Sequence, residues 1–368
     1  MSYQPGRMGL AEGIALVFTA TMSPVFLSLF SFTAIHVATS AWMVPAIACF
    51  EFFVILYALL YVLKTTDGDL FSACQQLVGT VATRLIALYY ICLYLLDAGL
   101  LLRQYAENTL LTALPQIDFE LVIAWYLLVI ILILHFGIET ISRGCSVLMP
   151  FVIFGLLVVM GLAIPRYNML YLTPWNGTGL DQTLLWGLQT CGVNLGALLP
   201  VILAASFQNA RTVRNAVACG LGLSTAIRVL SYAAYTAAFD IPAGREKVLP
   251  FFELARLVYI NRFFQRIEAF FIVLWSVMGM LNIAIDLYAG LYLLCRLFNL
   301  PALRPLIAPA AVIIAQLAML PGEVITVITL YARLAAGFYN LGTVLIPLIL
   351  FATALYRSRR RKPCQSAG

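Results

Sequence analysis

Residues 181–207 read DQTLLWGLQTCGVNLGALLPVILAASF, and this stretch decides the fold. It is long and apolar enough to cross a bilayer, for which about 20 residues suffice. Its middle nevertheless contains Gly192 and Gly196, and Pro200 follows the second glycine by one helical turn. Glycine loosens a helix, and proline removes a backbone donor and clashes with the preceding turn. Because lipid cannot satisfy a freed backbone group, the sequence predicts an interrupted helix against protein or a water-lined cavity.

A second interruption lies near the start of the chain. Residues 10–32 are apolar but contain Thr21, Ser23 and Pro24. Two interrupted helices at matching positions in two halves of a chain point to the substrate site of a transporter built from inverted repeats. The alternative for either break alone is a glycine-packed helix contact or a proline kink, both common in membrane helices. The matched positions favour a ligand site.

The composition is that of a polytopic membrane protein. Of the 368 residues, 63% are hydrophobic and 10% are charged, against about 25% charged residues in a soluble domain. The first apolar run continues without a small-residue cleavage site, so we expect no cleaved signal. The eight cysteines are scattered and the two histidines lie far apart. HExxH, GxSxG and Walker patterns are absent, so the sequence predicts no enzyme, no metal site and no cofactor.

We expect ten membrane spans in a single domain. In chain order they cover residues 10–32, 42–62, 81–102, 121–136, 138–164, 181–207, 213–239, 266–297, 305–320 and 334–356. Residues 250–257 precede the eighth span and have an amphipathic pattern suited to an interfacial helix.

The basic residues predict the orientation. With the N-terminus inside, cytoplasmic segments carry thirteen lysines and arginines and outer segments carry eight, leaving Arg228 within the seventh span. This bias favours two cytoplasmic termini. Much of the net charge of +6 lies in residues 357–368, a tail suited to anionic lipid at the cytoplasmic face and not to nucleic acid.

Four short motifs resemble a known family. They are LRQYAE at 102–107, GIETISR at 137–143, LPFFELAR at 249–256 and RIEAFF at 266–271, the last followed by Trp275. With them, nearly the whole chain resembles the spore germination receptor B-subunit family (GerAB type) of the amino acid–polyamine–organocation permease superfamily.

The resemblance implies an all-α fold of the leucine-transporter type, with ten helices in a 5+5 inverted repeat and the first and sixth helices broken. The repeats would cover about residues 8–164 and 181–356, before a basic cytoplasmic tail at 357–368. It also implies a receptor subunit that senses a germinant, often an amino acid, in the inner membrane of a bacterial spore. Its partners would be a larger A-type membrane subunit and a C-type lipoprotein.

Four charged residues fall inside apolar spans: Glu51, Asp97, Arg228 and Asp286. Each costs a few kcal/mol or more at the bilayer centre unless paired or hydrated, so each is a functional candidate. The alternative is a structural ion pair, which we favour for Glu51 and Arg228. Arg103 and Glu107 are one turn apart and can pair locally, and there a solvated helix end is the favoured interpretation.

An amino-acid ligand must have both its carboxylate and its ammonium satisfied, and the ends of half-helices supply the amides and carbonyls to do so. We therefore expect the ligand between the two breaks, where Asn194 would cap one half-helix and Gly196→Leu would fill the site. The implied fold adds side walls from the third and eighth helices. The expected ligand-binding residues are Thr21, Ser23, Pro24, Tyr94, Asp97, Gly192, Asn194, Gly196 and Trp275.

Two other functions stay open. One is an active amino-acid permease of the same fold, and the other is a structural subunit that binds nothing. The fifth span has no lysine to replace a coupling cation, and the oxygen ligands of a hard cation are not evident. These features favour a binding subunit over a driven transporter.

Overall fold

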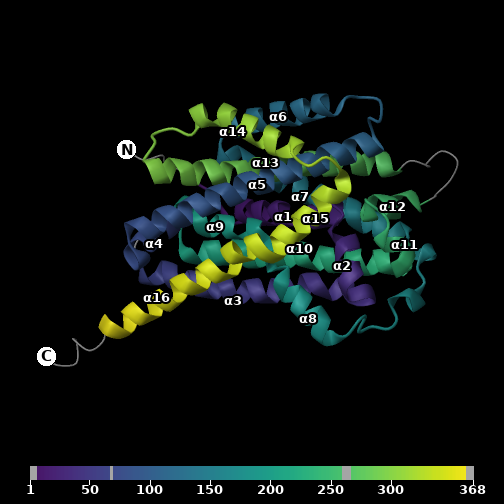
Figure 1. Cartoon of the computed structure of the whole chain (residues 1–368), viewed down its shortest axis with the longest axis horizontal. Helices are drawn as coiled ribbons and strands as arrows, with labels where there is room; N and C mark the ends of the chain where they lie inside the picture. Colours follow the sequence, from purple (N-terminus) through teal and green to yellow (C-terminus); the bar gives the residue numbers. More distant parts are fainter. Residues whose placement is uncertain (1–5, 67–68, 259–266, 362–368) are drawn as a thin grey trace.

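The computed structural model describes residues 6–66, 69–258 and 267–361. Within these ranges the secondary structure is helical throughout, without a strand, which confirms the all-α class. The long helices lie lengthwise beside one another, with α4 (Leu70–Val78) and the end of α16 (Ile346–Arg361) at one end of the molecule (Figure 1).

Seven described segments are long and apolar enough to cross a membrane, judged by length and composition. They are Leu29–Thr65, Thr80–Thr112, Ile138–Leu162, Leu180–Ile202, Ala210–Ala238, Glu268–Phe298 and Ile325–Ser358. Shorter apolar helices cover Leu10–Phe26, Phe119–His135 and Arg304–Met319. The chain is therefore a multi-pass membrane protein, and the number of ten crossings stays a prediction.

The first helix breaks later than expected. Helix α1 (Leu10–Phe26) continues through Pro24 and ends at Leu27, whose backbone is extended, before α2 (Leu29–Val37) begins. The expected break at residues 21–24 is wrong because the proline only removes the hydrogen bond to the carbonyl one turn earlier. The helix accommodates this loss and stops only where Leu27 leaves helical geometry.

The sixth span is interrupted where its glycines predict. Helix α8 (Leu180–Gln189) gives way to the 3₁₀ segment η4 (Cys191–Leu198), which is followed by the single turn α9 (Leu199–Ile202). Asn194, inside η4, has non-helical backbone angles of φ −88° and ψ 20°. All eight residues of η4 are buried, so protein surrounds the irregular backbone, as a membrane interior requires.

Two helix pairs form the centre of the bundle. Helices α5 (Thr80–Thr112) and α13 (Ile267–Phe298) run antiparallel, because Gly279 lies against Tyr105 while Gly290 lies against Leu95. Helix α1 packs against α10 (Ala210–Ala238), where Gly220 faces the carbonyl oxygen of Ile14. Glycine at these positions lets the helices approach closely.

The remaining principal elements surround this centre. They are η1 (Ala38–Met43), α3 (Val44–Thr65), α6 (Phe119–His135), α7 (Ile138–Leu162), α11 (Ile241–Arg245), α12 (Pro250–Arg256), α14 (Arg304–Met319), α15 (Val324–Leu334) and the π-helical turns η6 (Ala335–Tyr339) and η7 (Leu341–Leu345).

Two expectations about polar segments need correction. Helix α12 forms at the amphipathic stretch, but Phe251, Leu254 and Ala255 are buried and the helix contacts α1, α7, α10 and α13 instead of offering them to lipid. Arg103 and Glu107 do pair, at 2.9 Å, yet their side chains are only 9% and 14% exposed. The solvated helix end is therefore wrong, since Phe119 of α6 covers the guanidinium at 4.2 Å. Arg266 lies outside the described residues.

Helix α10 offers a matched test of its contact with α1. A Cβ atom at Gly220 would stand 2.6 Å from the carbonyl oxygen of Ile14, whereas one at Gly222 would meet no atom within 4 Å. We expect Gly220→Val to lower the free energy of unfolding by about 1–3 kcal/mol through overpacking. Gly222→Val makes the same change in helix propensity. Its melting temperature, measured on the detergent-purified protein, should stay near that of the wild type. Equal losses in both variants would show that the contact is not what matters.

Candidate functional site

The interruption of the sixth span packs directly against α1, one turn before Pro24. Pro24 leaves the carbonyl of Ala20 without its usual donor, and a Cβ atom on Gly196 would stand 2.7 Å from that oxygen and 2.5 Å from the Cβ of Ala20. Gly192 is equally close to its neighbours, because a Cβ there would stand 2.8 Å from the Cβ of Tyr339. Both glycines therefore allow backbones to pack directly.

This packing changes what Gly196→Leu would measure. The side chain would collide with α1 before it reached any ligand, so the expected test of the pocket is a test of folding. Ala197 is itself fully buried, so it does not supply a tolerant control.

Thr21 holds α1 against α10. Its hydroxyl donates to the carbonyl oxygen of Val17 at 2.8 Å and lies 2.7 Å from the hydroxyl of Ser224. Ser23 and Pro24 are buried in the following turn. On the opposite side, the Tyr94 hydroxyl of α5 makes a long hydrogen bond of 3.5 Å to the carbonyl oxygen of Leu195 in η4. The structure thus brings Tyr94 to the second break, as the implied fold predicts.

Asn194 binds an arginine and does not cap a half-helix. Its side-chain oxygen accepts a hydrogen bond of 2.8 Å from Arg228 Nη1, and its amide nitrogen donates to the carbonyl oxygen of Ala48 at 3.3 Å. Arg228 is 3% exposed and its Nε has no hydrogen-bond partner. Among the described residues, no carboxylate lies within ion-pair distance of Arg228, and no arginine or lysine lies within ion-pair distance of Glu51. The structural ion pairs that we favoured for these two residues are therefore wrong.

Two carboxyl groups meet between α5 and α13. Asp97 is 7% exposed and Asp286 is 2% exposed, and the two side chains interact with each other. Asp97 Oδ1 and Asp286 Oδ2 have no hydrogen-bond partner. In the part of the chain that the structure describes, neither carboxyl has a lysine or arginine at ion-pair distance. Carboxyl groups so placed are stabilised by a cation or by a shared proton.

More unpaired polar atoms lie along the same two helices. On α13, Trp275, Gly279, Asn282 and Asp286 follow one another at spacings of four, three and four residues and so share a face. Both polar atoms of Asn282 and the indole nitrogen of Trp275 are buried without a hydrogen-bond partner. Trp275 itself packs edge-on against Tyr105, with ring centroids 6.4 Å apart. It continues this polar column but lies almost three turns from Asp286.

Two tyrosines complete the cluster. Tyr339 of η6 lies close enough to Asp97 to interact with its carboxyl, although its hydroxyl has no hydrogen bond of normal geometry. Tyr331 of α15 is within electrostatic range of Asp97, Asp286 and Arg228 at once. The two rings pack edge to face, 6.0 Å apart. Neither tyrosine has a sequence signal, because each lies in an apolar stretch where an aromatic residue is ordinary.

We call Tyr94, Asp97, Arg228, Asp286, Tyr331 and Tyr339 the central polar cluster. It combines two buried carboxyl groups and one buried guanidinium that have no ionic partner among the described residues. Buried charges are normally paired, and a charged group of opposite sign on a bound ligand can act as the missing partner. The arrangement therefore suits a small molecule that carries both a cationic and an anionic group.

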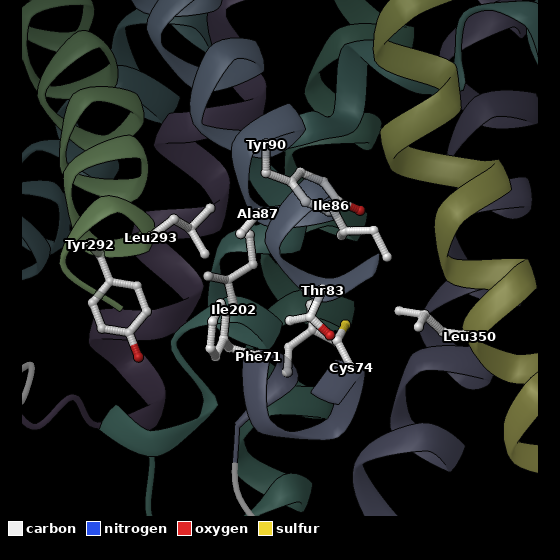
Figure 2. A pocket seen from close by; sticks show the side chains of 11 residues that line it. Phe71, Cys74, Thr83, Ile86, Ala87, Tyr90, Ile202, Tyr292, Leu293 and Leu350 are labelled. Carbon is white, nitrogen blue, oxygen red and sulfur yellow. The ribbon is translucent and has the colours of Figure 1, made fainter. Parts of the chain in front are cut away.

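A separate cavity lies nearer the end of the molecule formed by α4. Figure 2 shows its lining side chains, which come from α4, α5, α9, α13 and α16 and include Thr83, Tyr90 and Leu350. The cavity measures about 20 Å³, room for about one water molecule. No member of the central polar cluster lines this cavity, and the space is a packing gap too small for an amino acid.

Solved structures share this fold. Mhp1, a nucleobase-cation-symport-1 family transporter solved with bromovinylhydantoin bound, is 15% identical over 93% of this chain and 80% of its own, with a TM-score of 0.66. A Na⁺-coupled sialic acid symporter is 13% identical over 92% and 79%, with a TM-score of 0.64. MhsT, solved with L-phenylalanine, is 13% identical over 96% and 99%, with a TM-score of 0.64. The likeness shows a fold of the leucine-transporter type.

A search of curated protein sequences gave no match. The model of the spore germination protein family, Spore_permease, matches residues 11–324. This range includes both helix interruptions and every helix from α2 to α14. The chain therefore belongs to the spore germination protein family.

Proposed function

We propose that the protein is the germinant-sensing membrane subunit of a spore germination receptor and binds a small zwitterion, an amino acid, in the central polar cluster. The family and the fold are those of a membrane transporter or receptor subunit and not of an enzyme. The observation that carries the proposal is the pair of buried carboxyl groups, Asp97 and Asp286, which have no ionic partner among the described residues. Tyr331 lies within electrostatic range of both carboxyl groups and of the buried Arg228, whose Nε has no hydrogen-bond partner.

The cluster matches both ends of an amino acid. An ammonium group would lie against Asp97 and Asp286, and a carboxylate would lie against the free Nε edge of Arg228. Tyr331, which is within electrostatic range of all three residues, would lie beside the bound ligand. Each charge-assisted hydrogen bond formed in this way adds more to affinity than a neutral one. Thr21, Ser23, Pro24, Gly192 and Gly196 would then shape the walls through packing, while Trp275 would lie further along α13.

An active amino-acid permease is the second candidate. It is favoured by the solved structures of similar fold, which are described as transporters and symporters. A permease must open the cluster alternately to both sides, whereas a receptor subunit needs only to bind and change shape. Uptake of labelled amino acid into proteoliposomes distinguishes the two.

The charge match can be tested with ligand analogues. The purified protein is first screened by thermal shift against the twenty common amino acids, and the best ligand is compared with its decarboxylated amine and its deaminated acid. Asp286→Asn should weaken binding of the amino acid and the amine by about 10- to 100-fold, since one charge-assisted contact is lost. Arg228→Gln should weaken binding of the amino acid and the acid by a similar factor and spare the amine.

Arg103→Gln is the matched control, because Arg103 is also buried but pairs with Glu107 outside the cluster. It should lower the melting temperature of the free protein without changing the ligand preference. If both cluster variants keep wild-type affinity for all three compounds, the ligand binds elsewhere. Uptake against a gradient by the wild type would favour the permease.

We also propose that A-type and C-type subunits accompany this protein in the spore inner membrane, with both of its termini cytoplasmic and its repeats at about residues 8–164 and 181–356. Family membership and the basic residues support this arrangement. Purification from spores in mild detergent should recover the A-type subunit and the lipoprotein with the tagged protein. Recovery of the protein alone, while both partners are expressed, would contradict the proposal.

A further inference from the structure

A basic cavity lies between α3 and α10, at the end of the molecule where α4 and the C-terminal part of α16 are found (Figure 1). Its volume is about 320 Å³. The lining residues are Tyr57, Leu60, Tyr61, Lys64, Ala210, Arg211 and Arg214. Three of the seven are cationic and two are tyrosines, so the cavity differs in chemistry from the apolar grooves elsewhere on the bundle.

Within residues 6–66, 69–258 and 267–361, the three cations of this cavity have no anionic partner. Among the described residues no carboxylate lies within ion-pair distance of Lys64, Arg211 or Arg214. Arg214 donates only to the neutral side-chain oxygen of Asn215, at 3.1 and 3.2 Å. Like charges gathered at one cavity repel one another, and a bound anion removes this cost. Guanidinium groups bind phosphate oxygens in particularly favourable geometry.

An apolar stripe leads into the cavity along α3. Phe50, Val54 and Tyr57 are 71%, 53% and 72% exposed, and Tyr61 and Lys64 follow at the same alternation of four and three residues. That spacing places all five on one helix face. In a membrane this face meets lipid, with tyrosine at the level where hydrocarbon gives way to headgroups.

Helix α10 lies alongside this face. It packs against α3 and contributes Ala210, Arg211 and Arg214 to the lining of the cavity. The exposed stripe of α3 and the cations of the cavity thus follow one another in the order in which a phospholipid presents hydrocarbon and phosphate.

We propose that this cavity is a binding site for an anionic phospholipid, with the phosphate held by Lys64, Arg211 and Arg214 and an acyl chain lying along Phe50, Val54 and Tyr57. A free phosphate would use the cations but not the stripe. A zwitterionic lipid would contact the stripe, but its cationic headgroup would be repelled by the three cations of the cavity. The proposal is independent of the ligand in the central polar cluster, which lies deeper in the bundle.

The test measures lipid binding to the purified full-length protein in detergent by native mass spectrometry. The probes are phosphatidylglycerol, phosphatidylcholine with identical acyl chains, and inorganic phosphate. We expect phosphatidylglycerol to bind the wild type at least about tenfold more tightly than either of the other two. Arg211→Gln with Arg214→Gln should reduce that affinity by about 10- to 30-fold, as expected for two lost phosphate contacts.

A second double variant removes the same charge outside the cavity. Arg84→Gln with Arg304→Gln changes two exposed arginines that do not line it, and it should leave the affinity within about twofold of the wild type. Lys64→Gln provides a milder change at the cavity and should weaken binding in the same direction. The proposal fails if both double variants lose affinity equally, which would indicate general surface charge. It also fails if inorganic phosphate or phosphatidylcholine binds as tightly as phosphatidylglycerol.

Discussion

The structure depends on one constraint, the burial of charge without an ionic partner in the middle of a membrane protein. Asp97 and Asp286 face each other between α5 and α13, and Arg228, buried on α10, has Asn194 as its side-chain hydrogen-bond partner among the described residues. Lipid and apolar side chains stabilise none of these groups. Burying these charges without ionic partners lowers the free energy of unfolding of the bundle. Such a loss is typical of a binding site, which must stay complementary to its ligand.

The interrupted sixth span positions residues of this cluster by letting η4 pack closely against α1. Pro24 cannot donate the usual hydrogen bond to the Ala20 carbonyl, and Gly196 lets η4 come directly against this carbonyl. This contact fixes η4 so that Asn194 reaches Arg228 and the Leu195 carbonyl reaches Tyr94. The interruptions thus orient the polar side chains around them. Within the proposed site, side-chain charge would recognise the ligand more than the ends of half-helices.

The sequence predicted the class of fold, because hydropathy and the glycines of residues 192–196 report directly on a broken membrane helix. The fold implied by the family resemblance also predicted that the third span would face the second break, where the Tyr94 hydroxyl reaches the carbonyl oxygen of Leu195. The sequence misplaced the first break, since a proline disturbs the turn before it and the helix here tolerated that. The partner of Arg228 and the cover over Arg103 could not be predicted, because both depend on which helix lies alongside. Tyr331 and Tyr339 were missed for the same reason: only the packing of α15 and η6 brings them to Asp97.

The most direct test removes the charges and asks whether the empty protein becomes more stable. Asp97→Asn and Asp286→Asn keep the size of the side chains, and Arg228→Gln keeps a polar group on a shorter one. Combined in one variant, the three changes leave no buried charge in the cluster. The account predicts a higher melting temperature for the ligand-free variant in detergent than for the wild type, together with loss of the thermal shift by amino acids. A lower melting temperature with the shift retained would mean that the three residues are structural and that the ligand binds elsewhere.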